Sequence, residues 1–122
     1  MTTDKELIRI FDGATGTELS NTAQQNSCSI DELNIVAPDA VYNLQTAYIK
    51  AGTDFITTNT FGTNPAKWNS SKYSWQQVAN AAIAISKKAT CNTGVAVMFD
   101  VAPTGNLLVT THFRKHTTTI VR

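Results

Sequence analysis

Charge is scarce in this chain of 122 residues, in which charged residues make up 16% and the formal net charge is +1. So weak a net charge predicts no long-range attraction to nucleic acid or to a membrane surface, and the sequence contains no nucleic-acid-binding motif. Its apolar runs are far shorter than the roughly 20 residues that cross a membrane. The opening stretch MTTDKELIRIF has no apolar signal core. We therefore expect a cytoplasmic protein with one modest domain.

Cysteine is almost absent too. Cys28 and Cys91 are the only two and form no CxxC pair, so free thiols are expected. His112 and His116 have the spacing of two metal ligands on one helical turn. The basic pair between them and the threonines that follow argue against an ordered helix. We expect this region to be a solvated tail without metal ligands.

Three short apolar runs predict strands at residues 7–11, 54–60 and 95–101. The third, VAVMFDV, is almost continuously apolar, as is typical of strands covered on both faces. Between the first two runs, residues 13–36 are polar and rich in turn formers, which predicts a long loop with room for one helical turn.

Two segments with helical spacing lie between the later strands. One begins near Pro38, which suits the first helical position, and ends before Gly52, a suitable C-terminal cap. The other runs from about Ser74, a good N-cap, to about Thr90. The first helix is expected to face inward through Val41, Leu44, Tyr48 and Ala51. The second is expected to do so through Val78, Ala81, Ala82, Ile85 and Ala89. This alternation of strands and helices predicts an α/β fold with parallel strands.

Each predicted strand runs into small polar residues. Asp12-Gly13-Ala14-Thr15 follows the first, Thr58-Asn59-Thr60 ends the second, and Asp100 ends the third. In parallel α/β sheets the carboxyl ends of the strands meet at one edge, where ligands bind. The three clusters therefore predict a shared pocket. These residue types are also ordinary turn formers, and that interpretation stays open for each cluster taken alone.

The stretch DGATGT has two glycines separated by two residues and no lysine after them. It matches neither the dinucleotide-binding fingerprint nor the loop that cradles nucleoside triphosphates. Phosphate binding is therefore not expected here.

Three stretches together resemble a known family: FDGATGTEL, CSIDELNIVAPDAVYNLQTAYIKAGTDFITTNTFGTNPAKW and FDVAPTGNLL. In order and approximate spacing, they are similar over residues 7–108 to the N-terminal part of homocysteine S-methyltransferase domains. Such domains occur in cobalamin-dependent methionine synthase and in betaine–homocysteine methyltransferase. The AGTDFITTNTF run is the most specific part of the resemblance.

The resemblance implies a (β/α)8 TIM barrel with its active site at the C-terminal face of the strands. It also implies a methyltransferase in which homocysteine binds as a zinc-bound thiolate, because a metal keeps the nucleophilic sulfur deprotonated. The thiolate would take a methyl group from methylcobalamin, betaine or a methylsulfonium, and methionine would be the product.

The resemblance further implies substrate-binding residues. Asp12 would meet the amino group of homocysteine, and backbone N–H groups around Gly13 and Thr15 would hold its carboxylate. The lining from the second strand would be Thr58, Asn59 and Thr60. Thr15 itself stands where many members have Met or Gly, and Ala102 stands where many have Gly before Pro-Thr-Gly.

The larger departure is length, because a full barrel takes about 250 residues and this chain has 122. Residues 1–108 are expected to form a partial barrel of three strands and two helices, and 109–122 an unmatched, disordered tail. The family's zinc cysteines come from later strands, and neither Cys28 nor Cys91 matches them. No catalytic or metal-binding residue is therefore assigned, and the chain alone is expected to be inactive.

An incomplete barrel leaves strand edges open, so self-association is expected. The expected partners are homocysteine and either the missing barrel half or a cobalamin-binding domain. Two alternatives remain. The chain could be a small stand-alone α/β module that binds another small molecule, or a structural fragment that needs a partner chain.

Overall fold

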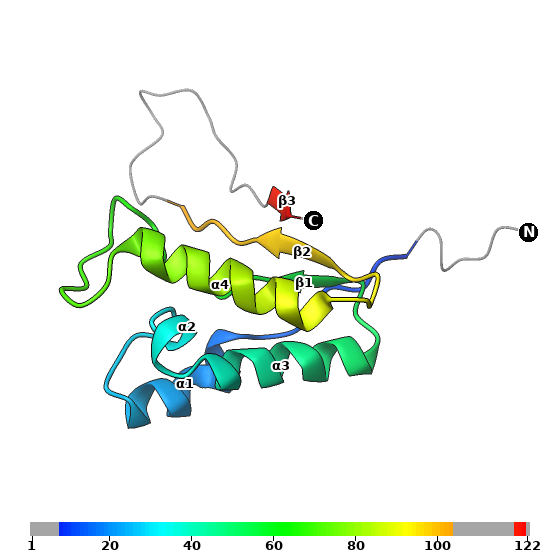
Figure 1. Cartoon of the computed structure of the whole chain (residues 1–122), viewed down its shortest axis with the longest axis horizontal. Coiled ribbons are helices and arrows are strands. Elements are labelled where there is room, and N and C mark those ends of the chain that lie inside the picture. The colour runs from blue at the N-terminus through cyan, green and yellow to red at the C-terminus, as the bar shows by residue number, and fades with distance from the viewer. Residues whose placement is uncertain (1–7, 104–118, 122) are drawn as a thin grey trace, which may run out of the picture.

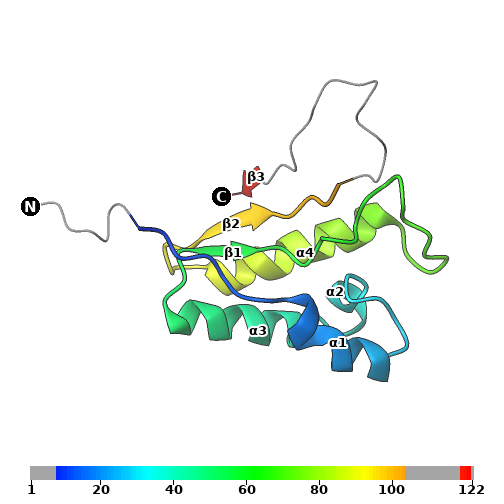
Figure 2. The same cartoon turned by 180° about the vertical axis from the view of Figure 1, so that it is seen from behind.

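The computed structural model describes residues 8–103 and 119–121. In chain order, its elements are α1 (Gly16–Gln25), α2 (Leu33–Val36), α3 (Pro38–Ala51), β1 (Phe55–Thr57), α4 (Trp75–Thr90), β2 (Ala96–Phe99) and β3 (Thr119–Val121). Figure 1 shows α3 and α4 side by side against the sheet, with α1 and α2 gathered near the carboxyl ends of β1 and β2. Figure 2 shows the sheet from the other side, in front of α4. No helix of the described part is long and apolar enough to cross a membrane.

The sheet has the order β1-β2-β3. β1 and β2 are parallel, with Phe55 opposite Ala96 and Thr57 opposite Met98. β3 is antiparallel to β2. The predicted α/β class and the parallel pairing of the second and third apolar runs are confirmed, whereas the closed barrel stays a prediction. Both strands are shorter than the runs that predicted them.

Residue 7 of the predicted strand at 7–11 lies outside the described residues, and residues 8–11 form a single parallel bridge, between Phe11 and Phe55. The reason is that two aspartate side chains accept backbone N–H groups that a regular strand pair would direct to backbone carbonyls. The Asp54 carboxylate accepts the Ile10 N–H at 2.7 Å, and the Asp12 carboxylate accepts the Thr57 N–H at 2.9 Å. The segment therefore lies beside β1 without forming a regular ladder.

The loop predicted for residues 13–36 is wrong over most of its length, because it contains α1 and α2. The ten-residue α1 buries only Leu19 and Ala23, which are four positions apart. A helix that buries two residues in an otherwise polar segment leaves almost no periodic signal in the sequence.

Both predicted helices are confirmed as α3 and α4. Gly52 ends α3 in the left-handed region at φ 104°, where a residue without Cβ costs least. Ser74 begins α4 with a capping box, in which its side chain accepts the Gln77 N–H and Gln77 returns the bond. The inward face of α3 differs from the prediction, because Gln45 is buried while Ala51 is exposed.

The main hydrophobic core lies between the helices and comprises Leu19, Ala23, Leu33, Val41 and Ile85. In β2, consecutive residues Ala96, Val97 and Met98 are all buried, so both faces of this strand are covered. The N-terminal segment differs sharply, because Ile8, Ile10 and Phe11 are 59%, 55% and 57% exposed.

The segment 109–122 is described only at Thr119–Val121, which form β3. These three residues are a strand where the sequence predicts no regular structure. The remainder of that segment, with His112 and His116, lies outside the described residues.

Candidate functional site

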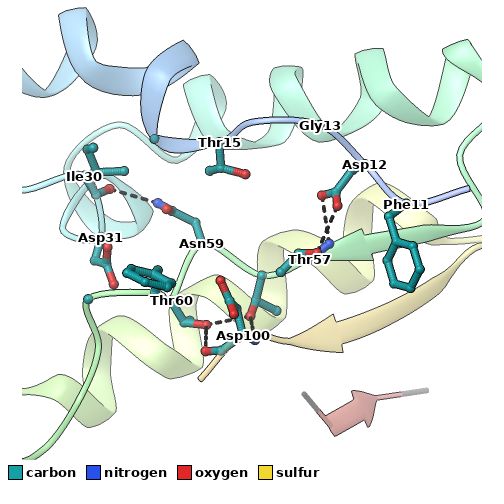
Figure 3. Close-up of a pocket in the computed structure, with 14 residues that line it drawn as sticks. Phe11, Asp12, Gly13, Thr15, Ile30, Asp31, Thr57, Asn59, Thr60 and Asp100 are labelled. Carbon is teal, nitrogen blue, oxygen red and sulfur yellow. Dashed lines mark hydrogen bonds between the residues drawn. The ribbon is translucent and has the colours of Figure 1, made fainter. Parts of the chain in front are cut away.

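A cleft of about 580 Å³ opens at the carboxyl ends of β1 and β2. Its walls come from residues 11–16, the loop at 30–31, residues 57–62 and Asp100 (Figure 3). The structure brings together every residue that the resemblance implies for the substrate: Asp12, Gly13, Thr15, Thr58, Asn59 and Thr60. Whether they bind a substrate stays a prediction, but their convergence at one strand edge is an observation.

Asp12 is held against the end of β1. One carboxylate oxygen accepts the Thr57 N–H at 2.9 Å, and the other accepts the Thr57 hydroxyl, also at 2.9 Å (Figure 3). Burial raises the pKa of Asp12, the bonds from Thr57 oppose that rise, and the negative charge of Asp100 adds to it. Each carboxylate oxygen has a second lone pair, so this fixed group can also accept a bond from a ligand.

The hydroxyls of Thr58 and Thr60 tie β1 to β2. Thr60 donates its hydroxyl to the Asp100 carbonyl at 2.8 Å, and the Asp100 N–H donates to Thr58 Oγ1 at 3.1 Å. The two hydroxyls lie 2.7 Å apart. Because the hydroxyl proton of Thr60 is directed to the Asp100 carbonyl, the Thr58 hydroxyl must donate to Thr60 Oγ1. Both threonines are buried, so their hydroxyls stabilise the floor of the cleft.

Asn59 joins the same floor to the loop before α2. Its amide nitrogen donates to the Ile30 carbonyl at 2.8 Å and to Asn34 Oδ1 at 3.2 Å. Asn34 returns a bond from its own amide to the Asn59 carbonyl at 2.8 Å. Asn59 and Asn34 are 4% and 2% exposed. The dense cluster of small polar residues after β1 therefore connects the strand end to β2 and to α2.

Asp31 lines the cleft but was missed by the sequence interpretation, which placed it in an undifferentiated loop. It is buried, and its carboxylate accepts the Thr63 hydroxyl at 2.5 Å. Burial raises the pKa of Asp31, and bonds from Thr63 and from the Gly62 backbone oppose the rise. A side chain at position 62 would place Cβ 3.2 Å from Asp31 Oδ1. The only sequence signal was that Asp31 precedes Glu32-Leu33-Asn34 in the stretch that resembles the family.

The charged side chains that line the described part of the cleft are all acidic. Its described lining contains Asp12, Asp31 and Asp100 and no Lys, Arg or His. In the wall formed by residues 11–16, which also carries Asp12, α1 begins after Thr15, whose side chain makes no capping bond. The first N–H groups of a helix carry partial positive charge and favour an anion. The cleft therefore offers carboxylates for a cation and a helix start for an anion.

A zinc ion does not fit the described residues, which contain no group of three His, Cys, Asp or Glu that could hold a metal. Cys28 borders a shallow depression beside α1 and α2, and Cys91 borders another near the start of β2. Both thiols are free. Neither lines the cleft, so no zinc-bound thiolate step is derived from this site.

Gly13 is expected to be essential to the shape of the cleft wall. A Cβ at this position would lie 2.7 Å from Tyr48 Oη and 2.9 Å from its Cε1. It would displace the ring, whose hydroxyl donates to the Ala14 carbonyl at 2.7 Å. Gly13→Ala should lower the free energy of unfolding by about 1–3 kcal/mol, the usual cost of overpacking, in urea denaturation.

Gly16→Ala is the matched control, because its Cβ would lie 3.6 Å from Ile30 Cδ1, an ordinary contact. Alanine in a helix is favoured over glycine by up to about 1 kcal/mol, so this change should leave stability equal or higher. Equal losses for both variants would contradict the role assigned to Tyr48.

Fold and site together define an α/β protein with a ligand-sized cleft at the carboxyl ends of parallel strands. A family model described as homocysteine S-methyltransferase matches residues 9–120. The chain therefore belongs to the homocysteine S-methyltransferase family. The match takes in most of the segment 109–122, beyond the last residue at which sequence motifs alone connected the chain with the family.

Proposed function

We propose that the cleft binds the amino-acid head of homocysteine. Membership of the homocysteine S-methyltransferase family supports this substrate. The observation that carries the proposal is the charge pattern of the cleft, whose described lining has three carboxylates, no basic residue and the uncapped start of α1. An α-amino acid has the complementary pattern, because its ammonium and carboxylate are separated by a single carbon atom.

In this arrangement Asp12 accepts hydrogen bonds from the ammonium group. Thr57 already holds both of its oxygens, so the carboxylate is oriented before the ligand arrives, which lowers the cost of binding. The carboxylate of homocysteine lies against backbone N–H groups around Gly13 and Thr15, at the start of α1. Thr58, Asn59 and Thr60 form the floor beneath it.

Methyl transfer to the sulfur is the reaction that the family implies, and the chain is proposed to supply the substrate-binding part of it. The zinc that would hold the thiolate needs ligands that the described residues do not provide. We therefore propose that the described residues do not catalyse methyl transfer alone, that they are part of a TIM barrel, and that the metal ligands lie outside them. Methylcobalamin is the proposed methyl donor.

Calorimetric titration with three ligands tests the binding proposal. L-Homocysteine should bind more tightly than 4-mercaptobutyrate, which lacks the ammonium, and more tightly than 3-aminopropane-1-thiol, which lacks the carboxylate. Asp12→Asn should weaken homocysteine binding by about 1.5–3 kcal/mol, the range for a hydrogen bond to a charged group. It should leave the affinity for 4-mercaptobutyrate unchanged.

Asp39→Asn is the matched control, because Asp39 is an exposed aspartate in the first turn of α3 and does not line the cleft. It should not affect either affinity. If wild-type chain binds homocysteine no better than 4-mercaptobutyrate, the proposed ammonium site is wrong. Preferential binding of an unrelated small molecule would favour the alternative of a stand-alone binding module.

A further inference from the structure

Two buried polar side chains lie where the helices α3 and α4 meet β1. Gln45 is 3% exposed and Ser86 is 0% exposed. Both occupy inward-facing positions that helical spacing would fill with apolar residues. A polar side chain in such a place costs free energy unless it is hydrogen-bonded, so its partners indicate what it does.

The partners form a continuous chain of hydrogen bonds that leads to the cleft. The Ser86 hydroxyl donates to Gln45 Oε1 at 3.1 Å. This fixes the amide of Gln45, whose Nε2 donates to the Thr57 carbonyl at 3.3 Å. Thr57 in turn donates its N–H and its hydroxyl to the two carboxylate oxygens of Asp12 (Figure 3).

Thr57 occupies the last position of β1, where regular pairing with the N-terminal segment has already ended. On the side of β1 that faces this segment, Phe11 and Phe55 form a single bridge. Two residues further along β1, the Thr57 N–H donates to the Asp12 side chain instead of to a backbone carbonyl. The Thr57 carbonyl is therefore held by a helix side chain. Without Gln45, the Thr57 carbonyl would lose the hydrogen bond that holds the peptide group at the end of β1 in one orientation.

We propose that Gln45 and Ser86 are positioning residues for the cleft, which act through Thr57 to hold the Asp12 carboxylate in the orientation that receives a ligand's ammonium group. This role rests on the proposed function of the cleft. Neither residue lines the cleft, so any effect on binding must pass through Thr57. Substitution of a residue needed only for packing would lower the stability of the chain without changing the orientation or the pKa of the Asp12 carboxylate.

The pKa of Asp12 provides a readout that is independent of any ligand. Bonds from Thr57 lower this pKa against the effect of burial, so loosening Thr57 should raise it. The other ionisable groups that interact with Asp12 are Asp100, at the end of β2, and Tyr48, on α3. Neither is changed by a substitution at Gln45 or Ser86, so a shift can be attributed to Thr57.

The test compares Gln45→Met and Ser86→Ala with Val41→Ala in the full chain. Val41 is 0% exposed on α3 and belongs to no hydrogen-bond chain, so Val41→Ala controls for lost stability. NMR titration of the aspartate carboxyl carbons should show a higher Asp12 pKa in Gln45→Met, a smaller rise in Ser86→Ala and no change in Val41→Ala. Gln45→Met should also weaken homocysteine binding about fivefold, the loss of one net hydrogen bond, while 4-mercaptobutyrate binding stays the same.

An Asp12 pKa that is unchanged in Gln45→Met and Ser86→Ala, or that shifts equally in Val41→Ala, would overturn the positioning role. Failure of the proposed function has a different signature, in which wild-type chain does not distinguish homocysteine from 4-mercaptobutyrate. If Gln45→Met does not fold, Ser86→Ala decides the matter alone, because it removes only the hydroxyl that fixes the Gln45 amide and is still expected to raise the Asp12 pKa.

Discussion

Replacement of Asn59 by alanine is expected to lower the free energy of unfolding by about 1.5–4.5 kcal/mol. The substitution would leave Asn34 Oδ1 without the donor that it has now, and it would remove one of the two bonds to the Ile30 carbonyl, which keeps the bond from the Leu33 N–H. An unpaired buried polar group costs about 1–3 kcal/mol, and the net loss of one further hydrogen bond about 0.5–1.5 kcal/mol. Small domains are stable by only about 5–15 kcal/mol in total, so Asn59→Ala should remove a large part of the stability of the chain.

Urea denaturation followed by circular dichroism measures this loss. Asn80→Ala is the matched control, because Asn80 is exposed within α4 and alanine is the better helix former. It should leave stability equal or slightly higher. If Asn59→Ala were as stable as wild type and instead lost homocysteine binding, Asn59 would be a ligand contact whose bonds to Ile30 and Asn34 contribute little.

The position of the candidate site could be predicted from the sequence, because the carboxyl ends of parallel strands converge whatever the details of packing. The roles of its residues could not. Thr58, Asn59 and Thr60 look alike as pocket-lining residues in the sequence. In the structure their side chains bond to Asp100, Ile30 and each other, and those partners are brought near only by the tertiary fold.

The errors in the predicted fold have the same origin. Gly52 and Ser74 predicted the end of α3 and the start of α4 correctly, because helix capping depends on residues close to the cap in the sequence. The strand at 7–11 failed because Asp54, more than forty positions away in sequence, accepts the Ile10 N–H. Gln45 was not expected to face inward, because its partners Thr57 and Ser86 lie on two other elements.

The chain is expected to self-associate through its N-terminal segment. Ile8, Ile10 and Phe11 are each more than half exposed, and they lie at an edge of the sheet where pairing with β1 is limited to one bridge. Open edges with apolar side chains favour pairing with another chain. Burying a large apolar side chain contributes about 1.5–3 kcal/mol. By contrast, Val97 in β2 is buried.

Sedimentation velocity at several concentrations should therefore show a sedimentation coefficient that rises with concentration. The double variant Ile8→Thr/Ile10→Thr removes two apolar side chains from each copy. At about half of the full burial value per side chain, it should weaken a dimer at least about 100-fold. Val36→Thr, on α2 and also partly exposed at 38%, controls for a general loss of surface hydrophobicity and should leave association unchanged. A wild-type chain that stays monomeric at every concentration, with a sharp cooperative melt, would show that residues 8–11 need no partner and that the sheet is complete without further strands.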